Sequence, residues 1–317
     1  MTGEAVVRAA KLDFAYGTNR VLEGVDLELA AGEVFGVVGP DGAGKSTLLR
    51  LLIGQLEPSG GQVAVLGRPA TDPSLRQRMA YMPQGFGQYL GLSVGENLEF
   101  FADLHGLAPA DSRVLIADLL ARTGLGPFRG RRAGQLSGGM MQKLALACAL
   151  VSRPKVMFLD EPTTGVDPVS RRAFWQLIDQ VRAEGVAIVY ATANMEEAER
   201  CDRVGMLVHG AFGRQGPPLD LIRQVEPALF EVTGPGVRAR RNELRALAHV
   251  ALVFPVGETL KVWLDSAREE ASWRDAVARL TPPLEVKALR PQLHDIALRD
   301  LALSAANAHG ASRQPRH

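Results

Sequence analysis

The sequence has few of the features that mark secreted, membrane-spanning or polyanion-binding proteins. Only two cysteines, Cys148 and Cys201, occur among 317 residues, and we interpret them as buried thiols that fit a reducing compartment. No run reaches the ~18 apolar residues that a membrane helix needs, and no signal-peptide segment opens the chain. Lys and Arg total 36 against 35 Asp and Glu. Because the positive and negative charges are nearly equal, we expect that nucleic acid is not a partner.

The first two thirds of the chain alternate strand and helix patterns around a helical insertion. Strands are predicted at 6–12, 21–29, 33–38, 62–66, 79–82, 156–160 and 187–192, and helices at 46–54, 94–104, 112–123 and 138–151. Several of the strands are continuous apolar runs, which is typical of parallel strands buried on both faces. This order predicts an α/β domain over residues 1–222, with a helical subdomain at about 86–153.

The composition changes after about Gly216, where a second pattern begins. Strands are predicted at 229–232, 250–254, 260–264 and 284–289, and helices at 241–248, 267–280 and 292–303. This β-α-β-β-α-β order predicts a small α+β domain of ferredoxin-like type over residues 228–303. Residues 304–317 are rich in Ala, Gly, Ser and Arg without periodicity, so we expect a disordered tail.

A glycine-rich loop between a predicted strand and a predicted helix fits the pattern G-x-x-x-x-G-K-[ST]. Its residues are Gly39, Pro40, Asp41, Gly42, Ala43, Gly44, Lys45 and Ser46, followed by Thr47. Glycines let backbone N–H groups approach phosphates closely, Lys45 reaches the β- and γ-phosphates, and the Ser46 hydroxyl ligates Mg²⁺. A chance glycine-rich turn is the alternative, but the flanking strand and helix argue against it.

Two acidic residues end the apolar run at 156–160. Carboxylates after a buried strand are costly unless a cation lies near them. We therefore expect Asp160 to hold Mg²⁺ through water and Glu161 to polarise an attacking water molecule. The alternative is that these are surface acids after a strand. The presence of the phosphate-binding loop in the same sequence argues against it.

The run Leu136–Gln142, at the start of a predicted helix, is the most specific motif. It resembles the signature motif of ABC transporter ATPases, and the resemblance covers about residues 5–215. In that family the motif binds a phosphate held by the opposite subunit, which implies head-to-tail pairing of two nucleotide-binding domains. The residues that this resemblance assigns to nucleotide contact are Ser137, Gly138, Gly139 and Gln142.

The resemblance implies a RecA-like P-loop NTPase core with an ABC helical subdomain, and it adds three further site residues. Tyr16 corresponds to the aromatic residue that stacks on adenine. Gln84 corresponds to the glutamine that contacts Mg²⁺ and water, and Asp167 belongs to the loop that crosses the dimer interface. The principal catalytic residues would be Glu161, Lys45 and Gln84.

One position departs from the family pattern. After the strand at 187–192 the family places a histidine that binds the γ-phosphate, but this chain has Ala193 there. Asn194 is an alternative donor, although it lies one position further along. Because the signature motif is intact, we expect a weakened site on this chain's own phosphate loop and a competent site on a partner.

The resemblance predicts an ATP-hydrolysing subunit of an ABC-2-type, multidrug-like exporter, with ATP and Mg²⁺ as cofactors. The expected partners are membrane permease subunits and a second nucleotide-binding domain, with a heterodimer favoured and a periplasmic adaptor as a further candidate. The expected location is the cytoplasm, on the inner face of the membrane through the permease. Two rival hypotheses remain: a non-transport ABC protein, and a regulatory subunit that binds ATP without hydrolysing it.

Overall fold

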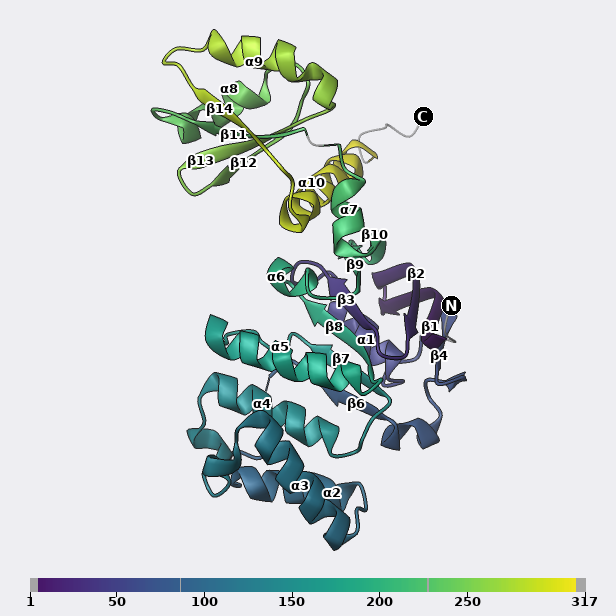
Figure 1. The fold of residues 1–317 in the computed structure, drawn as a ribbon. Coiled ribbons are helices and arrows are strands. Elements are labelled where there is room, and N and C mark those ends of the chain that lie inside the picture. Colours follow the sequence, from purple (N-terminus) through teal and green to yellow (C-terminus); the bar gives the residue numbers. More distant parts are fainter. Residues whose placement is uncertain (1–4, 86, 227, 312–317) are drawn as a thin grey trace. The chain divides into compact units, whose positions relative to one another are not determined.

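The computed structural model of the chain describes residues 5–85, 87–226 and 228–311. It divides into a first unit that ends at Gln215 and a second unit that begins at Gly216. Figure 1 shows both units coloured along the sequence.

An antiparallel sheet in the order β2-β1-β4-β5 forms one layer of the first unit. Its strands are β1 (Ala5–Tyr16), β2 (Asn19–Ala30), β4 (Gly60–Val65) and β5 (Arg68–Pro69). Buried and exposed residues alternate along β1 and β2, as expected for strands with one face on the core. The buried face packs on the same hydrophobic core as helix α1 (Lys45–Leu52).

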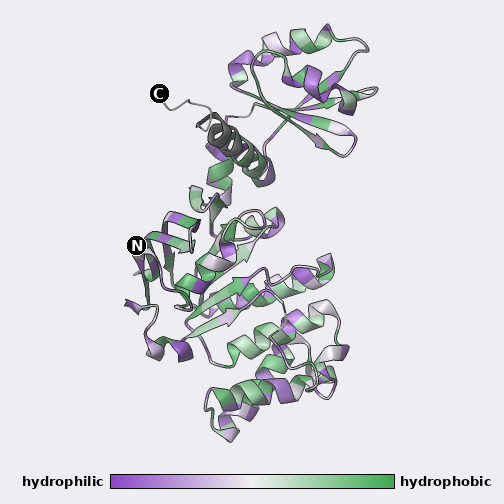
Figure 2. Cartoon of the chain, turned by 180° about the vertical axis from the view of Figure 1, so that it is seen from behind, coloured by the Kyte–Doolittle hydropathy of each residue, from purple (hydrophilic) through white to green (hydrophobic). Residues whose placement is uncertain are grey.

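A second sheet in the order β10-β9-β3-β8-β7-β6 is the centre of the first unit. Its strands are β3 (Val34–Val38), β6 (Met79–Met82), β7 (Val156–Asp160), β8 (Ala187–Thr192), β9 (Arg203–Val208) and β10 (Ala211–Gly216). Every residue of β3, β7 and β8 is buried, and hydrophobic colouring dominates these strands in Figure 2. Because β6, β7, β8, β3 and β9 pair in parallel, their carboxyl ends lie along one edge, where α/β proteins bind ligands.

Three helices inserted between β6 and β7 form the helical subdomain: α2 (Val94–Leu104), α3 (Pro109–Thr123) and α4 (Gly138–Leu150). Ser93 begins α2 with a capping box, in which its hydroxyl accepts from the Glu96 backbone while the Glu96 carboxylate accepts from the Ser93 backbone. Helix α4 is buried over most of its surface. After β7 the chain continues into α5 (Pro168–Ala183), and the short α6 (Met195–Ala198) follows β8.

The second unit contains an antiparallel sheet in the order β12-β13-β11-β14. Its elements are β11 (Leu229–Thr233), α8 (Arg241–Arg245), β12 (Val250–Val256), β13 (Thr259–Leu264), α9 (Glu270–Ala278) and β14 (Glu285–Leu289). Their order confirms the predicted β-α-β-β-α-β arrangement. Phe230, Val262 and Trp273 are fully buried in its core, so this unit has an apolar core of its own.

The structure differs from the sequence-based prediction in several elements. Helix α5 and strands β9 and β10 were not predicted. Helix α7 (Pro218–Arg223) packs with α10 (Leu293–Ala311) in the second unit, although its residues were predicted to belong to the first domain. Helix α10 also continues past the predicted end at residue 303 into a segment rich in alanine, the residue with the highest helix propensity. The structure thus has helix at 304–311, where the sequence predicts a disordered tail, and 312–317 lie outside the described residues.

Two expectations about composition can be compared with the described residues. Both cysteines are buried free thiols, and burial raises the pKa of each, as expected for unreactive sulfur. Within 5–85, 87–226 and 228–311, no helix is both long and apolar enough to cross a membrane.

Close packing at the centre of the parallel sheet gives a stability prediction. A Cβ at Gly36 of β3 would lie 2.9 Å from both Cys201 Sγ and Val204 Cγ1. We expect Gly36→Ala to lower the free energy of unfolding by about 1–3 kcal/mol through overpacking. Urea unfolding measures this change. Gly91→Ala is the control, because a Cβ added at Gly91 would meet no atom within 4 Å apart from its chain neighbours. Equal stability of the two variants would contradict the prediction.

Candidate nucleotide-binding site

The loop from β3 to α1 needs glycine at particular positions. A Cβ at Gly39 would lie 2.4 Å from the Leu207 carbonyl oxygen, so only glycine fits against β9 there. Gly44 precedes α1 with a left-handed φ of 103°, a conformation that glycine adopts without steric cost. The loop therefore meets the amino end of α1 with its backbone open to an anion, as a phosphate-binding loop requires.

Lys45 lies where this loop meets the end of β7. Its Nζ atom donates to the carbonyl oxygens of Gly39 and Pro40, at 2.9 and 3.0 Å. The same Nζ forms an ion pair with Glu161 Oε1 at 2.9 Å, although the Lys45 side chain is only 4% exposed. A phosphate entering the loop would compete with Glu161 for this cation.

Ser46 and Asp160 place two oxygen ligands side by side. The Ser46 hydroxyl donates to Asp160 Oδ1 at 3.0 Å, and the Tyr81 hydroxyl donates to Oδ2 at 3.3 Å. Burial raises the pKa of Asp160, while the hydrogen bonds from Ser46 and Tyr81 oppose this rise by stabilising the carboxylate. Hydroxyl and carboxylate oxygens suit Mg²⁺, which usually keeps several waters and takes further ligands from substrate phosphates. The described part of the chain holds no cluster of three or more His, Cys, Asp or Glu suited to a metal.

Glu161 follows β7 in a left-handed conformation with φ of 49°. A side chain with this backbone is strained unless its surroundings hold it. Besides Lys45, it accepts hydrogen bonds at Oε2 from Gln84 Nε2 at 3.3 Å and from Thr164 Oγ1 at 3.2 Å. The arrangement fixes one carboxylate beside the glycine-rich loop.

These side chains surround one pocket of about 350 Å³. Its lining residues are Tyr16, Val21, Asp41, Gly42, Gly44, Lys45, Ser46, Thr47, Gln84 and Glu161. Tyr16 at the end of β1 is 47% exposed and rests edge-on against Phe14 at 4.8 Å, which leaves ring surface available for stacking. The fold thus brings the predicted loop residues, Tyr16, Gln84 and Glu161 together.

The predicted signature residues lie apart from this pocket, at the start of α4. Ser137 caps α4 through the Met140 N–H and is exposed together with Gly138. Gly139 is buried close to Ser170. Gln142 is only 5% exposed and its Oε1 has no hydrogen-bond partner. In this conformation Ser137 and Gly138 are accessible to a ligand, whereas the Gln142 side chain is not.

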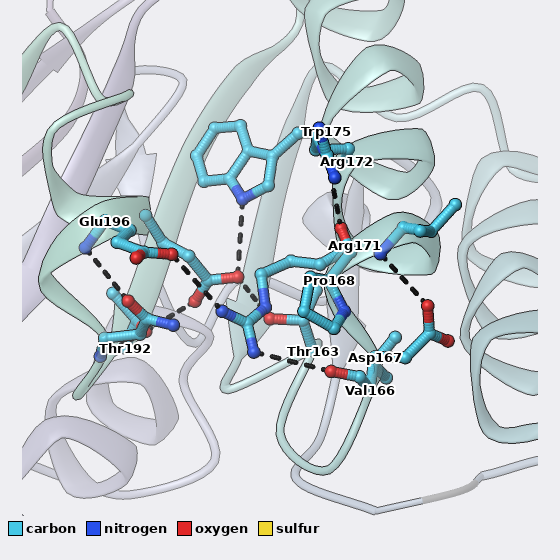
Figure 3. Close-up of polar contacts among 12 residues, drawn as sticks. Thr163, Val166, Asp167, Pro168, Arg171, Arg172, Trp175, Thr192 and Glu196 are labelled. Carbon is cyan, nitrogen blue, oxygen red and sulfur yellow. Dashed lines mark hydrogen bonds and ion pairs between the residues drawn. The ribbon is translucent and has the colours of Figure 1, made fainter.

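Asp167 is also outside the pocket and caps α5. Its Oδ1 accepts from the Ser170 and Val169 backbone N–H groups at 2.9 and 3.0 Å. A hydrogen bond with the Ser170 side chain, together with these backbone bonds, lowers the pKa of Asp167. Figure 3 shows Asp167 at the start of this helix. In this structure its side chain therefore caps α5 at the end of the loop that follows Glu161.

Comparison with known proteins agrees with this geometry. The family model described as "ABC transporter" matches residues 22–164. A "Nod factor export ATP-binding protein I" of Burkholderia orbicola is 38% identical over 249 residues, which cover 77% of this chain and 81% of the relative. The chain belongs to the ABC transporter ATP-binding proteins.

Two further comparisons show how much of this ABC protein is similar to known proteins. The "Probable multidrug ABC transporter ATP-binding protein YbhF" of Escherichia coli K12 is 45% identical over 225 residues, 70% of this chain but only 39% of that protein. A solved "Structure of ATP binding subunit of ABC transporter" is 30% identical with a TM-score of 0.63 and covers 69% of this chain and 92% of that chain. The chain thus spans well under half the length of the YbhF relative.

The position where the ABC family carries a histidine borders a second opening. Ala193 is exposed and lines a pocket of about 270 Å³ with Thr163, Gly165, Asn194 and other residues. The side chain of the alternative donor Asn194 caps α6, because its Oδ1 accepts from the Glu196 backbone N–H. A contact from Asn194 to a phosphate would have to come from its Nδ2 group, since an amide oxygen only accepts hydrogen bonds.

Sequence reasoning missed two residues that hold the candidate catalytic carboxylates. Tyr81 bonds Asp160 and Thr164 bonds Glu161. Tyr81 lies on β6, next to β7 in the sheet, and only this pairing brings its hydroxyl to Asp160. Thr164 lies three residues after Glu161, a spacing that could have indicated a turn bond.

The Tyr81 bond leads to a prediction about ionisation. Tyr81→Phe removes a donor that favours the charged form of Asp160, so the already raised pKa of Asp160 should rise further. Carbon-13 NMR titration of labelled aspartate carboxyl groups measures this pKa, with Asp160→Asn to assign the signal. Tyr89→Phe, which removes an exposed hydroxyl elsewhere, serves as control. An unchanged or lower pKa in Tyr81→Phe would disprove the assignment.

Proposed function

We propose that the chain hydrolyses ATP and powers an ABC-2-type exporter through separate membrane permease subunits. The observation that carries this proposal is the meeting of Lys45, Ser46, Gln84 and Glu161 around one pocket, with Asp160 hydrogen-bonded to Ser46 beside it. Relatives named for multidrug transport and Nod factor export support an export function.

In this proposal each polar group has a separate role. The loop N–H groups and Lys45 bind the phosphates of ATP, and Tyr16 stacks on the adenine. Ser46, Asp160 and Gln84 would hold Mg²⁺, which neutralises phosphate charge when bound. Lys45 then pairs with phosphate, and Glu161 accepts a proton from the attacking water. The bonds from Gln84 and Thr164 keep Glu161 oriented for this step.

A second nucleotide-binding domain is the first proposed partner. Ser137 and Gly138 are exposed at the amino end of α4, where backbone donors can bind a phosphate on another subunit. Ala193 favours a partner that carries the missing histidine, because this chain would then complete the partner's site. A heterodimer is therefore the proposed assembly.

The permease is the second proposed partner, and an exposed apolar patch supports it. The patch consists of Tyr89, Leu90, Phe100 and Leu104, which are 51%, 55%, 38% and 67% exposed. The rings of Tyr89 and Phe100 meet at 4.7 Å, and Leu104 follows Phe100 by one helical turn. Grouped apolar residues of this size mark protein contacts. The patch follows Gln84 in the sequence, and docking there would place the protein on the inner face of the membrane.

The role of Glu161 gives the main test of this function. Glu161→Gln keeps the shape of the side chain but cannot accept a proton, so ATP hydrolysis should fall by ~10²–10⁴-fold. ATP-bound dimers should accumulate and be visible by size-exclusion chromatography with ATP and Mg²⁺. Glu57→Gln, a change at an exposed glutamate, is the matched control. Unchanged turnover in Glu161→Gln would assign the general base to another residue.

The absence of the histidine gives a second test. We expect the isolated protein to bind ATP and hydrolyse it slowly, and Ala193→His to raise the rate several-fold by adding a phosphate contact. Turnover at ~1 s⁻¹ or above in the unmodified protein, with no gain from Ala193→His, would refute the asymmetric assembly. ATP binding without turnover in both proteins would instead support the regulatory rival.

A further inference from the structure

A buried carboxylate outside the nucleotide pocket collects four hydrogen bonds. Glu197 of α6 is 3% exposed. Its Oε1 accepts from Thr163 Oγ1, from the Tyr190 hydroxyl at 2.9 Å and from the Trp175 indole at 3.3 Å, and its Oε2 accepts from Thr192 Oγ1 at 2.7 Å. Figure 3 labels three of the four donor residues, Thr163, Trp175 and Thr192.

The polar character of this cluster needs an explanation beyond stability. A buried carboxylate is expensive to desolvate, and a well-packed apolar group often stabilises such a site equally well. All four donors are neutral side chains, and each is at most 3% exposed. Unlike an apolar group, the carboxylate makes directional hydrogen bonds, and these fix the positions of four separate side chains at once.

Three of the four donors lie on regular elements and one does not. Trp175 belongs to α5, and Tyr190 and Thr192 belong to β8. Thr163 lies in the segment between β7 and α5, which starts with Glu161 and ends with the helix cap Asp167. The bond from Thr163 is therefore the one through which Glu197 acts on this segment.

Thr163 lies at the middle of that segment. Its carbonyl oxygen accepts from the Val166 N–H at 3.1 Å, while the neighbouring Thr164 hydroxyl bonds Glu161 at 3.2 Å. Arg171 of α5 provides a looser second contact, at 3.4 Å to the Val166 carbonyl oxygen (Figure 3). A shift of Thr163 would consequently move both the Glu161 side chain and the loop before Asp167.

The same cluster bridges the two segments that border Ala193. Thr163, Thr192 and Glu197 all line the pocket of about 270 Å³ that Ala193 also lines, and Glu197 accepts a hydrogen bond from each threonine. Alanine at 193 has no polar side chain. The Glu197 carboxylate therefore connects the segment after β7 to the end of β8 through its bonds with Thr163 and Thr192.

We propose that Glu197 is a positioning residue, which holds Glu161 in its working geometry through the hydroxyl of Thr163. The inference rests on the proposed ATP hydrolysis. It predicts that ATP hydrolysis falls more when Glu197 loses its hydrogen bond from the 161–167 segment than when it loses one from strand β8. Thr163→Val and Tyr190→Phe each remove one hydroxyl that donates to the same Oε1, and they differ in where that hydroxyl was attached.

The test compares these two variants in the full-length chain. Thr163→Val should lower the kcat of ATP hydrolysis by roughly 10- to 100-fold with KM changed little, since small misplacements of catalytic groups have effects of this size. Tyr190→Phe should keep kcat within about 3-fold of the unmodified chain, because the bond between Thr163 and Glu197 remains and strand pairing holds β8 in place. Thr163→Ser restores the hydroxyl and should recover most of the lost activity. Equal losses in Thr163→Val and Tyr190→Phe would overturn the proposal.

A second measurement separates this inference from the proposed function. Amide hydrogen exchange of the segment 161–167 should be roughly 10-fold faster in Thr163→Val than in Tyr190→Phe, because only the former frees the segment. If the unmodified chain does not hydrolyse ATP, the proposed function fails, but the exchange rates still decide whether Glu197 holds the segment. Equal exchange in the two variants would refute the positioning role.

Discussion

The ion pair between Lys45 and Glu161 is the interaction on which the site depends. It joins the phosphate-binding loop after β3 to the end of β7, although the two strands are separated in the sheet by β8. Two nearly buried charges at this distance are stable only with good geometry and further hydrogen bonds. Gly39, Pro40, Gln84 and Thr164 supply those bonds. The parallel sheet makes this possible by bringing the ends of its strands to one edge.

The sequence was a good guide to elements with a strong local signal. Strands β7 and β8 and helix α2 have the predicted bounds, because apolar runs or a capping sequence mark their ends. The β-α-β-β-α-β order of the second unit was also predictable from periodicity. The prediction failed where local signals were weak or were read wrongly: α5, β9 and β10 were overlooked, and α10 was ended too early.

The candidate site was predictable to a similar degree, for a different reason. Lys45, Ser46, Asp160 and Glu161 belong to short motifs in which neighbouring residues share one task, so the sequence alone indicates them. Tyr81 and Glu197 act through contacts with residues distant in the sequence, at Asp160 and Thr163. No local pattern specifies such contacts, because they arise from strand pairing and from the packing of α6. The structure also limits the prediction for Gln142, which is buried in α4.

The left-handed backbone of Glu161 has a consequence for how this protein can change. A residue other than glycine or asparagine at φ of 49° is held against its own preference, at a cost of roughly 1–2 kcal/mol. The ion pair with Lys45 offsets this cost, because removing the carboxylate would leave the nearly buried Lys45 charge without its partner. Glycine or asparagine would relieve the backbone at position 161 and at the same time unpair the lysine, so a change tolerated at one of these two positions requires a change at the other.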